Sequence, residues 1–365
     1  MNASAMSDKE RWMNSIDMKP VDRLIFWPKL DETHCSTRRW PGAVPSVREL
    51  YSWVGCDVQE WIPSVLVEKH PHSTFAVKTE GIFQTITYGV KGRELTMRKQ
   101  FDPATMSWHP MRMPIKTVED VCVMAEWFRD IVNDYTQEAV ETAKAACVHA
   151  GEGSLWATAL GESPLMYTIE WLAGIDTHYL LFDYRDEMEE LFDAIHRDLL
   201  KKAEILCAHS PSDVIYMIEN TSTTLINLEQ YRDYCLRQVN EYGEYIRGSG
   251  KRYFLHMCGH LKALLPLLRQ TNAHAFEAFT PPTLGDTTLT DGREGCPDKC
   301  FLGGTHAEML ISSADRVIGY LDDQLSRLPH HRGIVVTSGG MTPKFAQHEM
   351  LREVCEYVKT YPVRN

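Results

Sequence analysis

From residue 154 onward the sequence alternates between short apolar runs and longer segments with helical periodicity, and this alternation is the strongest constraint on the fold. Each run is bounded by polar or turn-forming residues and is followed by a stretch whose apolar residues recur every three or four positions. Repeated strand–helix units of this kind predict a parallel sheet covered by helices. The predicted strands are Leu155–Leu160, Val214–Ile218, Tyr253–His256, Ala275–Ala278, Cys300–Gly303 and Ile334–Thr337.

The number of these units favours a barrel. Together with the apolar run Leu24–Trp27 they nearly complete the eight strands of a (β/α)8 barrel, and a doubly wound open sheet is the alternative. We therefore expect the α/β class, with the whole chain forming a single TIM barrel domain and an N-terminal elaboration over about residues 1–150. A β-hairpin is predicted over Gly81–Phe101 and a long helical stretch over Thr117–Val148, whereas residues 29–65 show no regular pattern.

Charge and cysteine content restrict the class of protein. The formal net charge is −12, from 38 basic and 50 acidic residues, which argues against a general nucleic-acid or anionic-membrane surface. It suits a protein that handles a small molecule or docks a protein partner, and a homodimer is compatible with it. The first 22 residues are polar and no segment has the apolar length of a membrane span, so we expect a cytoplasmic protein whose ten cysteines are reduced thiols.

The end of the strand predicted over Tyr253–His256 carries two metal-ligand side chains. His256 and Cys258 are two residues apart, so in extended backbone they face the same side. An imidazole and a thiol leaving one strand end make half of a zinc site, although such a short pattern also occurs by chance. Because the carboxyl ends of barrel strands converge on one mouth, this pair is expected to lie where barrels hold their active sites.

Other strand ends also carry polar groups. Glu219 follows an apolar strand and is a candidate for proton transfer, with capping of the next helix as the alternative. Glu277 lies inside the run Ala275–Phe279, where a lone carboxylate is hard to explain as a core residue. His306 is a second candidate for proton transfer, with an ordinary loop histidine as its alternative.

Three further residues near predicted strand ends are candidates for contact with a substrate: Trp27, Glu162 and Ser338. No Gly-x-Gly-x-x-Gly or phosphate-binding Gly-rich loop follows a strand, and no Gly-x-Ser-x-Gly element is present. Nucleotide-dependent enzymes and serine hydrolases are therefore poorly supported.

Several of these segments together resemble the uroporphyrinogen decarboxylase superfamily. Lys9-Glu10-Arg11 and the segment Lys19–Arg23 resemble its opening, and Thr337–Pro343 resembles its last strand and loop. The element His256-Met257-Cys258-Gly259 is similar to the zinc motif of the methyltransferase branch, which includes the methylcobamide:coenzyme M methyltransferases. Phe276-Glu277, followed by Thr280-Pro281-Pro282, is similar to a segment of corrinoid-linked members. The resemblance implies a (β/α)8 barrel with its active site at the C-terminal mouth.

Two departures from the superfamily pattern bear on function. The decarboxylases carry an Arg-rich element after the first strand to hold substrate carboxylates, whereas this chain has Phe26–Asp31 there, which argues against porphyrinogen decarboxylation. Coenzyme M methyltransferases supply another cysteine from the last-strand loop, where this chain has Ser338. The resemblance therefore implies zinc held by His256 and Cys258, with Glu277 as the preferred third ligand. Glu219 and His306 are the reserves for that position.

The resemblance implies corrinoid-dependent methyl transfer. We expect demethylation of a small methylated substrate, with an aromatic methyl ether as the first choice, in which zinc polarises the leaving oxygen. The chain lacks an Asp-x-His-x-x-Gly element, so the cobalamin-type corrinoid is expected on a partner protein. The alternatives are methyl transfer from a methylcobamide to a thiol, and a metal-free barrel that decarboxylates or only binds a ligand.

Overall fold

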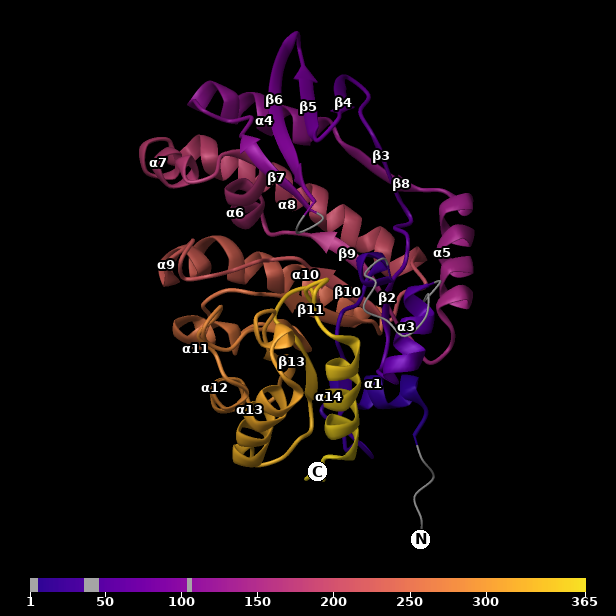
Figure 1. Cartoon of the computed structure of the whole chain (residues 1–365). Coiled ribbons are helices and arrows are strands. Elements are labelled where there is room, and N and C mark those ends of the chain that lie inside the picture. The colour runs from indigo at the N-terminus through magenta and orange to yellow at the C-terminus, as the bar shows by residue number, and fades with distance from the viewer. Residues whose placement is uncertain (1–5, 36–45, 104–106) are drawn as a thin grey trace.

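The computed structural model describes residues 6–35, 46–103 and 107–365, and within them eight parallel strands form a barrel (Figure 1). The strand order is β1-β14-β13-β12-β11-β10-β9-β2, so the first strand pairs with the last and sequential neighbours pair through most of the ring. This confirms the TIM barrel over the open sheet. The strands are β1 Ile25–Trp27, β2 Gln59–Trp61, β9 Leu155–Gly161, β10 Val214–Met217, β11 Arg252–His256, β12 Ala275–Phe279, β13 Cys300–Thr305 and β14 Ile334–Ser338.

Strands β1 and β2 are at the two ends of this strand order, and Asp57, just before β2, connects them by hydrogen bonds to β1. Its backbone N–H donates to the Phe26 carbonyl at 2.9 Å, and its carboxylate accepts from the Phe26 N–H at 3.1 Å. Arg23 donates to both carboxylate oxygens of the buried Asp57, at 2.9 and 2.8 Å. Strand β2 lies in the segment that was expected to be irregular, because the sequence Gln-Glu-Trp has no apolar run and becomes a strand only by pairing with β9.

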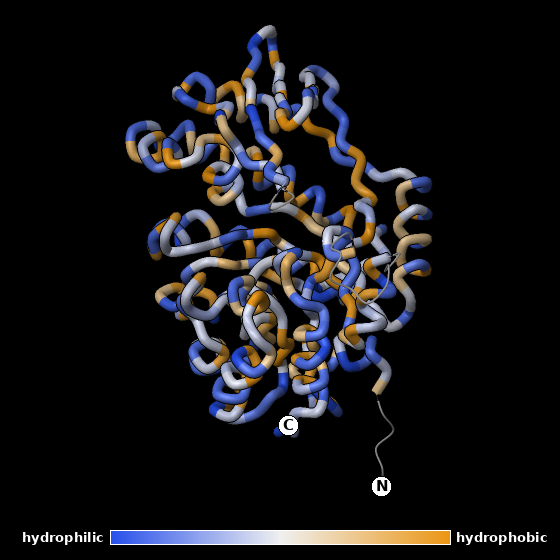
Figure 2. The backbone as a smooth tube through the Cα atoms, in the orientation of Figure 1, coloured by the Kyte–Doolittle hydropathy of each residue, from blue (hydrophilic) through white to orange (hydrophobic). Residues whose placement is uncertain are grey.

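Amphipathic helices surround the ring. In α13, Val317, Leu321 and Leu325 recur at four-residue spacing and are all buried, while the opposite face is charged. Figure 2 shows the same alternation of hydrophobic and hydrophilic stretches along the helices. The helices after β9 are α6 Pro164–Tyr167, α7 Asp176–Asp183, α8 Arg185–His209, α9 Leu228–Tyr231, α10 Arg237–Gly248, α11 Leu265–Leu268, α12 Leu289–Gly295, α13 Ala314–Arg327 and α14 His348–Thr360.

The elaboration lies mainly between β2 and β9, since β1 and β2 themselves belong to the barrel. Its centre is an antiparallel sheet in the order β4-β5-β6-β7, which stands over one side of the barrel mouth (Figure 1). The predicted hairpin is confirmed as β5 and β6. The elements before β9 that lie outside the barrel sheet are α1 Asp8–Ile16, α2 Glu32–Cys35 and α3 Val47–Val54, which precede β2, and then β3 Leu66–Lys69, β4 Ser73–Glu80, β5 Phe83–Val90, β6 Arg93–Asp102, β7 Ser107–Arg112, α4 Val118–Asp130, β8 Val132–Tyr135 and α5 Gln137–Ala150.

The long helix predicted over Thr117–Val148 is wrong in one respect, because β8 divides it into α4 and α5. Strand β8 pairs with β3, and Thr136 then caps α5 by accepting a hydrogen bond from the Ala139 N–H at 3.2 Å. None of the helices in the described ranges combines the length and apolar composition needed to cross a bilayer.

Candidate active site

A cavity of about 550 Å³ opens at the carboxyl ends of the barrel strands. Strands β11 and β12 contribute His256 and Glu277 to its wall, and the segment after β1 contributes Lys29. Aromatic and acidic side chains make up much of the rest. The lining includes Trp27, Lys29, Asp31, Glu32, Arg48, Tyr51, Glu60, Trp61, His149, His256, Glu277 and Met341.

Glu277 is the centre of a charged triad in this cavity. His256 and Glu277 are register partners on β11 and β12, so their side chains lie side by side. The His256 Nδ1 contacts one carboxylate oxygen of Glu277, and the Lys29 ammonium contacts the other. Lys29 and Glu277 are buried, whereas 20% of the His256 side chain stays exposed. The triad therefore offers its imidazole, and neither of its other members, to a molecule in the cavity.

Electrostatics fix the protonation of the triad. Burial alone would raise the pKa of Glu277, but the charges and hydrogen bonds of Lys29 and His256 outweigh it and lower that pKa to about 2. Burial would lower the pKa of His256, but the Glu277 charge, with hydrogen bonds to Cys258 and Glu277, raises it to about 9. At neutral pH the site thus holds a carboxylate between an ammonium and an imidazolium.

Lys29 was not predicted as a site residue. It adopts a left-handed backbone conformation, with φ of 52°, two residues after β1, and its ammonium reaches the Glu277 carboxylate. Its ammonium lies 5.3 Å from the ring centroid of Trp27, whose indole N–H is buried without a hydrogen-bond partner among the described residues. The only signal in the sequence was a single basic residue in the segment that replaces the decarboxylases' Arg-rich element.

Cys258 lies beside the triad but outside the lining of this cavity, and it is hydrogen-bonded to a separate set of polar side chains. Its thiol donates to Asn220 Oδ1 at 3.6 Å, and Asn220 Nδ2 donates to Glu170 at 3.0 Å. Burial raises the pKa of Glu170 to about 8. Asn220, which has a φ of 45°, and Glu170 were both missed, because the first depends on backbone conformation and the second lies within a helical segment.

The side chains at the mouth supply fewer donors than a catalytic zinc ion requires. Within the described ranges, no group of three or more His, Cys, Asp or Glu side chains is arranged to hold a metal ion. Both oxygens of Glu277 are engaged, by Lys29 and His256, which leaves His256 and Cys258 as two donors where catalytic zinc usually has three protein ligands. The residues present do not fit the predicted three-ligand set, and the chemistry below is derived from the protein's own groups.

Glu219 and His306, the candidates for proton transfer, lie outside the lining of this cavity. Glu219 is fully buried and accepts hydrogen bonds from the Ser163 N–H at 2.6 Å and the Ser163 hydroxyl at 2.7 Å. Burial raises the pKa of Glu219 to about 7. Ser163 is the N-terminal cap of α6, so Glu219 ties the end of β10 to the start of that helix. His306 is buried, and its Nδ1 has no hydrogen-bond partner among the described residues.

The candidate substrate contacts fall in different places. Trp27 lines the cavity at the barrel mouth. Ser338 ends β14, where it is buried, outside the cavity lining, and its hydroxyl lacks a hydrogen-bond partner in the described part of the chain. Glu162 lines a second cavity instead. The structure thus brings His256, Glu277 and Trp27 together with Lys29, places Cys258 next to them, and separates Glu162, Glu219, His306 and Ser338 from this cavity.

Comparisons with known proteins agree with this architecture. The family model described as uroporphyrinogen decarboxylase (URO-D) matches residues 173–361. A methyltransferase from Methanosarcina mazei has a similar structure, with a TM-score of 0.61, 12% sequence identity, and coverage of 96% of this chain and 98% of that chain. At this identity the likeness shows the fold alone. No curated protein sequence matches the chain significantly.

A more distant structural likeness is to a chain assigned as a vitamin-B12 independent methionine synthase from Listeria monocytogenes. Its TM-score is 0.44 at 12% identity, with coverage of 63% of this chain and 71% of that chain. That similarity is too low to carry an argument.

Proposed function

Because the chain belongs to the uroporphyrinogen decarboxylase (URO-D) family, we propose that it is a methyltransferase of that family, which moves a methyl group from a small substrate to a corrinoid held by a partner protein. Two observations support this proposal. The His256-Met257-Cys258-Gly259 element resembles that of the methyltransferase branch. The fold is similar to that of the Methanosarcina mazei methyltransferase over nearly the full length of both chains.

The charge of the cavity wall is the observation that favours methyl transfer over decarboxylation. A porphyrinogen substrate bears several carboxylates, which require cationic side chains free to pair with them. The cavity wall instead carries four carboxylates against one lysine, one arginine and the His256 imidazolium, and both the lysine and the imidazolium are already paired with Glu277. The acidic residues are Asp31, Glu32, Glu60 and Glu277, and the lysine and arginine are Lys29 and Arg48.

The cavity suits a flat, neutral molecule. Trp27, Tyr51 and Trp61 supply aromatic faces, and the volume of about 550 Å³ lies within the usual range for small-molecule sites. An aromatic methyl ether has a ring to stack on these faces and a single oxygen to place near His256. It is the substrate class that we propose.

The triad would act on the leaving oxygen. When the methyl carbon is transferred to the cobalt of the partner's corrinoid, the O–CH₃ bond breaks and its electron pair stays on the oxygen. Because Nδ1 of His256 faces Glu277, Nε2 is the ring nitrogen that would face this oxygen and donate a proton to it. Glu277 orients the imidazolium, and Lys29 holds Glu277 in its ionised form.

The test is a reconstituted assay with the purified chain, a separately purified corrinoid protein in its reduced state, and a panel of aromatic methyl ethers. The demethylated product, measured by mass spectrometry, and the methylated corrinoid, measured by absorbance, are expected to form one for one. Turnover without corrinoid, or release of CO₂ from a carboxylated analogue, would contradict the proposal in favour of the decarboxylase alternative. Methyl transfer only from a methylated corrinoid to a thiol would establish the reverse direction.

Glu277→Gln tests the triad in that assay. The variant keeps the shape of the side chain but loses the charge that holds His256 protonated, so we expect methyl transfer to fall by about 10²-fold or more while the fold persists. The matched control is Glu244→Gln, because Glu244 is exposed on α10, close to where the chain enters β11 at the end opposite the mouth. Full activity in Glu277→Gln would remove the triad from the mechanism.

A further inference from the structure

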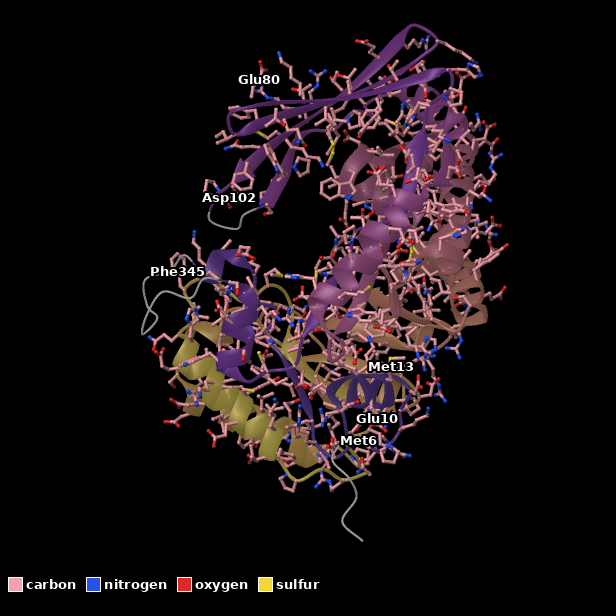
Figure 3. The ribbon with its side chains drawn as sticks, turned by 90° about the vertical axis from the view of Figure 1, so that its right-hand side faces the viewer. Met6, Glu10, Met13, Glu80, Asp102 and Phe345 are labelled. Atoms are coloured by element: carbon pink, nitrogen blue, oxygen red, sulfur yellow. The ribbon has the colours of Figure 1, made fainter. Side chains whose placement is uncertain are left out.

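A second cavity, of about 390 Å³, lies between the end of β9, helix α8 and the inserted antiparallel sheet, which stands above the barrel in Figure 3. Its lining shares no residue with the cavity at the barrel mouth. Aromatic side chains dominate its wall, among them Tyr88, Trp127, Tyr167 and Trp171. The proposed function makes no use of this cavity.

One group of charges in this wall is paired internally. The Lys202 ammonium lies 2.7 Å from Asp198 and 3.0 Å from Glu68, and His70 contacts Glu68 at 2.9 Å. Consistent with this pairing, the pKa of Glu68 is held below its ordinary value by Lys202 and His70 despite burial. Lys202, Asp198 and Glu68 therefore each already have a partner of opposite charge.

Two other charges in the wall are not paired. Lys99 and Glu162 both line the cavity, yet neither forms an ion pair with any residue in the described ranges. The Lys99 ammonium lies 4.2 Å from the ring centroid of Trp171, and the Trp171 indole N–H donates to Glu162 at 3.1 Å. Burial lowers the pKa of Lys99 and raises that of Glu162, as expected for charges that lack a full partner. Opposite charges thus flank one aromatic-walled space, and their mutual attraction only partly offsets the cost of burying them.

The backbone directs Glu162 into this space. The register between β9 and β10 shifts between Tyr216 and Met217, so that Leu160 is an extra residue in β9. Gly161 then adopts a φ of 140°, a conformation that favours glycine. The bulge and the glycine together place Glu162 in the wall of the second cavity.

We propose that this cavity binds a small zwitterion, either an α-amino acid or a betaine, with its carboxylate on Lys99 and its ammonium on Glu162. The aromatic wall is suited to the cationic end. Tyr88 and Trp127 meet edge to face, with ring centroids 5.0 Å apart, and Phe75 lies 5.6 Å from Tyr88. Such clusters of rings bind ammonium groups by cation–π attraction. The volume is near the lower end of the range for small-molecule sites, which suits a ligand of this size.

Isothermal titration calorimetry on the full chain tests this proposal with five probes: glycine betaine, L-leucine, L-phenylalanine, choline and butyrate. At least one zwitterion is expected to bind about tenfold or more tightly than choline, which lacks the carboxylate, and than butyrate, which lacks the ammonium. Tighter binding of betaine than of the two amino acids would identify a methylated ammonium as the preferred ligand, and the opposite order would identify a primary ammonium.

Two variants assign the ends of the ligand. Lys99→Met is expected to weaken the zwitterion about tenfold while leaving choline unchanged, and Glu162→Gln is expected to weaken both. Lys78→Met is the matched control, because Lys78 is an exposed lysine on β4 of the same sheet. Both tested residues lie at the edge of the cavity with part of their surface exposed, so the variants should fold, which their thermal unfolding would confirm.

Three outcomes would overturn the proposal. They are no heat of binding with either class of zwitterion, choline or butyrate binding as tightly as the best zwitterion, and Lys99→Met binding that zwitterion like the unsubstituted protein.

Discussion

Lys29 and Glu277 are buried against each other, so removing one side chain changes the electrostatic environment of the other. Lys29→Met removes one partner and leaves the Glu277 carboxylate with His256 as its only counter-charge. We expect the free energy of unfolding to fall by about 3 kcal/mol, as is usual when one partner of a buried pair is removed. Urea denaturation followed by circular dichroism measures this loss.

A double-mutant cycle with Glu277→Leu completes that test. If Lys29 acts through Glu277, the double variant Lys29→Met/Glu277→Leu should recover most of the stability lost in Lys29→Met, because no unpaired charge remains buried. Strictly additive losses would show that Lys29 and Glu277 stabilise the fold independently.

Zinc binding by His256 and Cys258 remains a prediction. The motif predicts about one zinc per chain after a mild chelator wash, and none in Cys258→Ala, which deletes the thiolate, whereas the engagement of Glu277 by Lys29 and His256 predicts that neither protein retains zinc. Elemental analysis by mass spectrometry measures this, with Cys122→Ala as the control because Cys122 is exposed on α4. A protein that is free of zinc as purified, and that takes up none on titration, would show that the triad operates without a metal.

At the scale of elements, His274 links two barrel strands and makes their junction sensitive to pH. Its Nδ1 accepts a hydrogen bond from the Tyr253 N–H at 3.0 Å, and the Cys300 N–H donates to its carbonyl at 3.0 Å. Burial, with the nearby charges of Arg247 and Arg252, lowers the pKa of His274 from 6.5 to about 4. Between these values the unfolded chain binds a proton that the folded chain does not, so stability is complete above pH 6.5 and falls as the pH drops toward 4.

The resulting loss between pH 7 and pH 4 should be on the order of 2 kcal/mol, after allowance for the partial exposure of the ring. Urea unfolding at a series of pH values measures it. His274→Asn should flatten this dependence, whereas His72→Asn, at an exposed histidine, should not. An unchanged slope in His274→Asn would assign the pH dependence to other groups.

The sequence predicted seven of the eight barrel strands in the described ranges, because each has a continuous apolar run that a strand buried on both faces requires. It missed β2, whose three residues become a strand only by pairing with β9.

For the candidate site, the sequence predicted His256 and Glu277, because ligand-type and acidic side chains at strand ends are unusual among apolar residues. It missed Lys29 and Asn220, because left-handed backbone at non-glycine residues has no clear sequence signal. Glu162 was found as a polar strand end, but the β-bulge that determines which cavity it lines is a property of pairing.

At the scale of the whole molecule, the inserted sheet and the barrel face each other across the mouth, with Asp102 and Phe345 on the two sides in Figure 3, and Lys344 donates to the Pro103 carbonyl between them at 3.2 Å. In the proposed function a corrinoid approaches the substrate through this region, and the chain has a net charge of −12. If the partner is attracted by that charge, the second-order rate constant of methyl transfer should fall as salt rises from about 0.01 to 0.15 M.

Stopped-flow measurement of corrinoid methylation gives this rate constant. Glu32→Lys, at the mouth, should reduce it more than Glu244→Lys, on α10 at the far side of the barrel, and the difference should shrink at high salt. Equal effects of the two reversals would place the docking surface away from the mouth.

The pairing of β1 with β14 has a consequence for how the chain acquires its site during synthesis. The Thr337 hydroxyl donates to the Trp27 carbonyl, and these residues are 310 positions apart. Trp27 and Lys29, which line the cavity, therefore gain their final neighbours only after β14 has left the ribosome. Contacts this distant in sequence carry a high loop-closure cost and form late in folding. A nascent chain that ends before β14 would lack both β14 and α14 and could not close the barrel, so the cavity at its mouth stays incomplete until β14 has been synthesised.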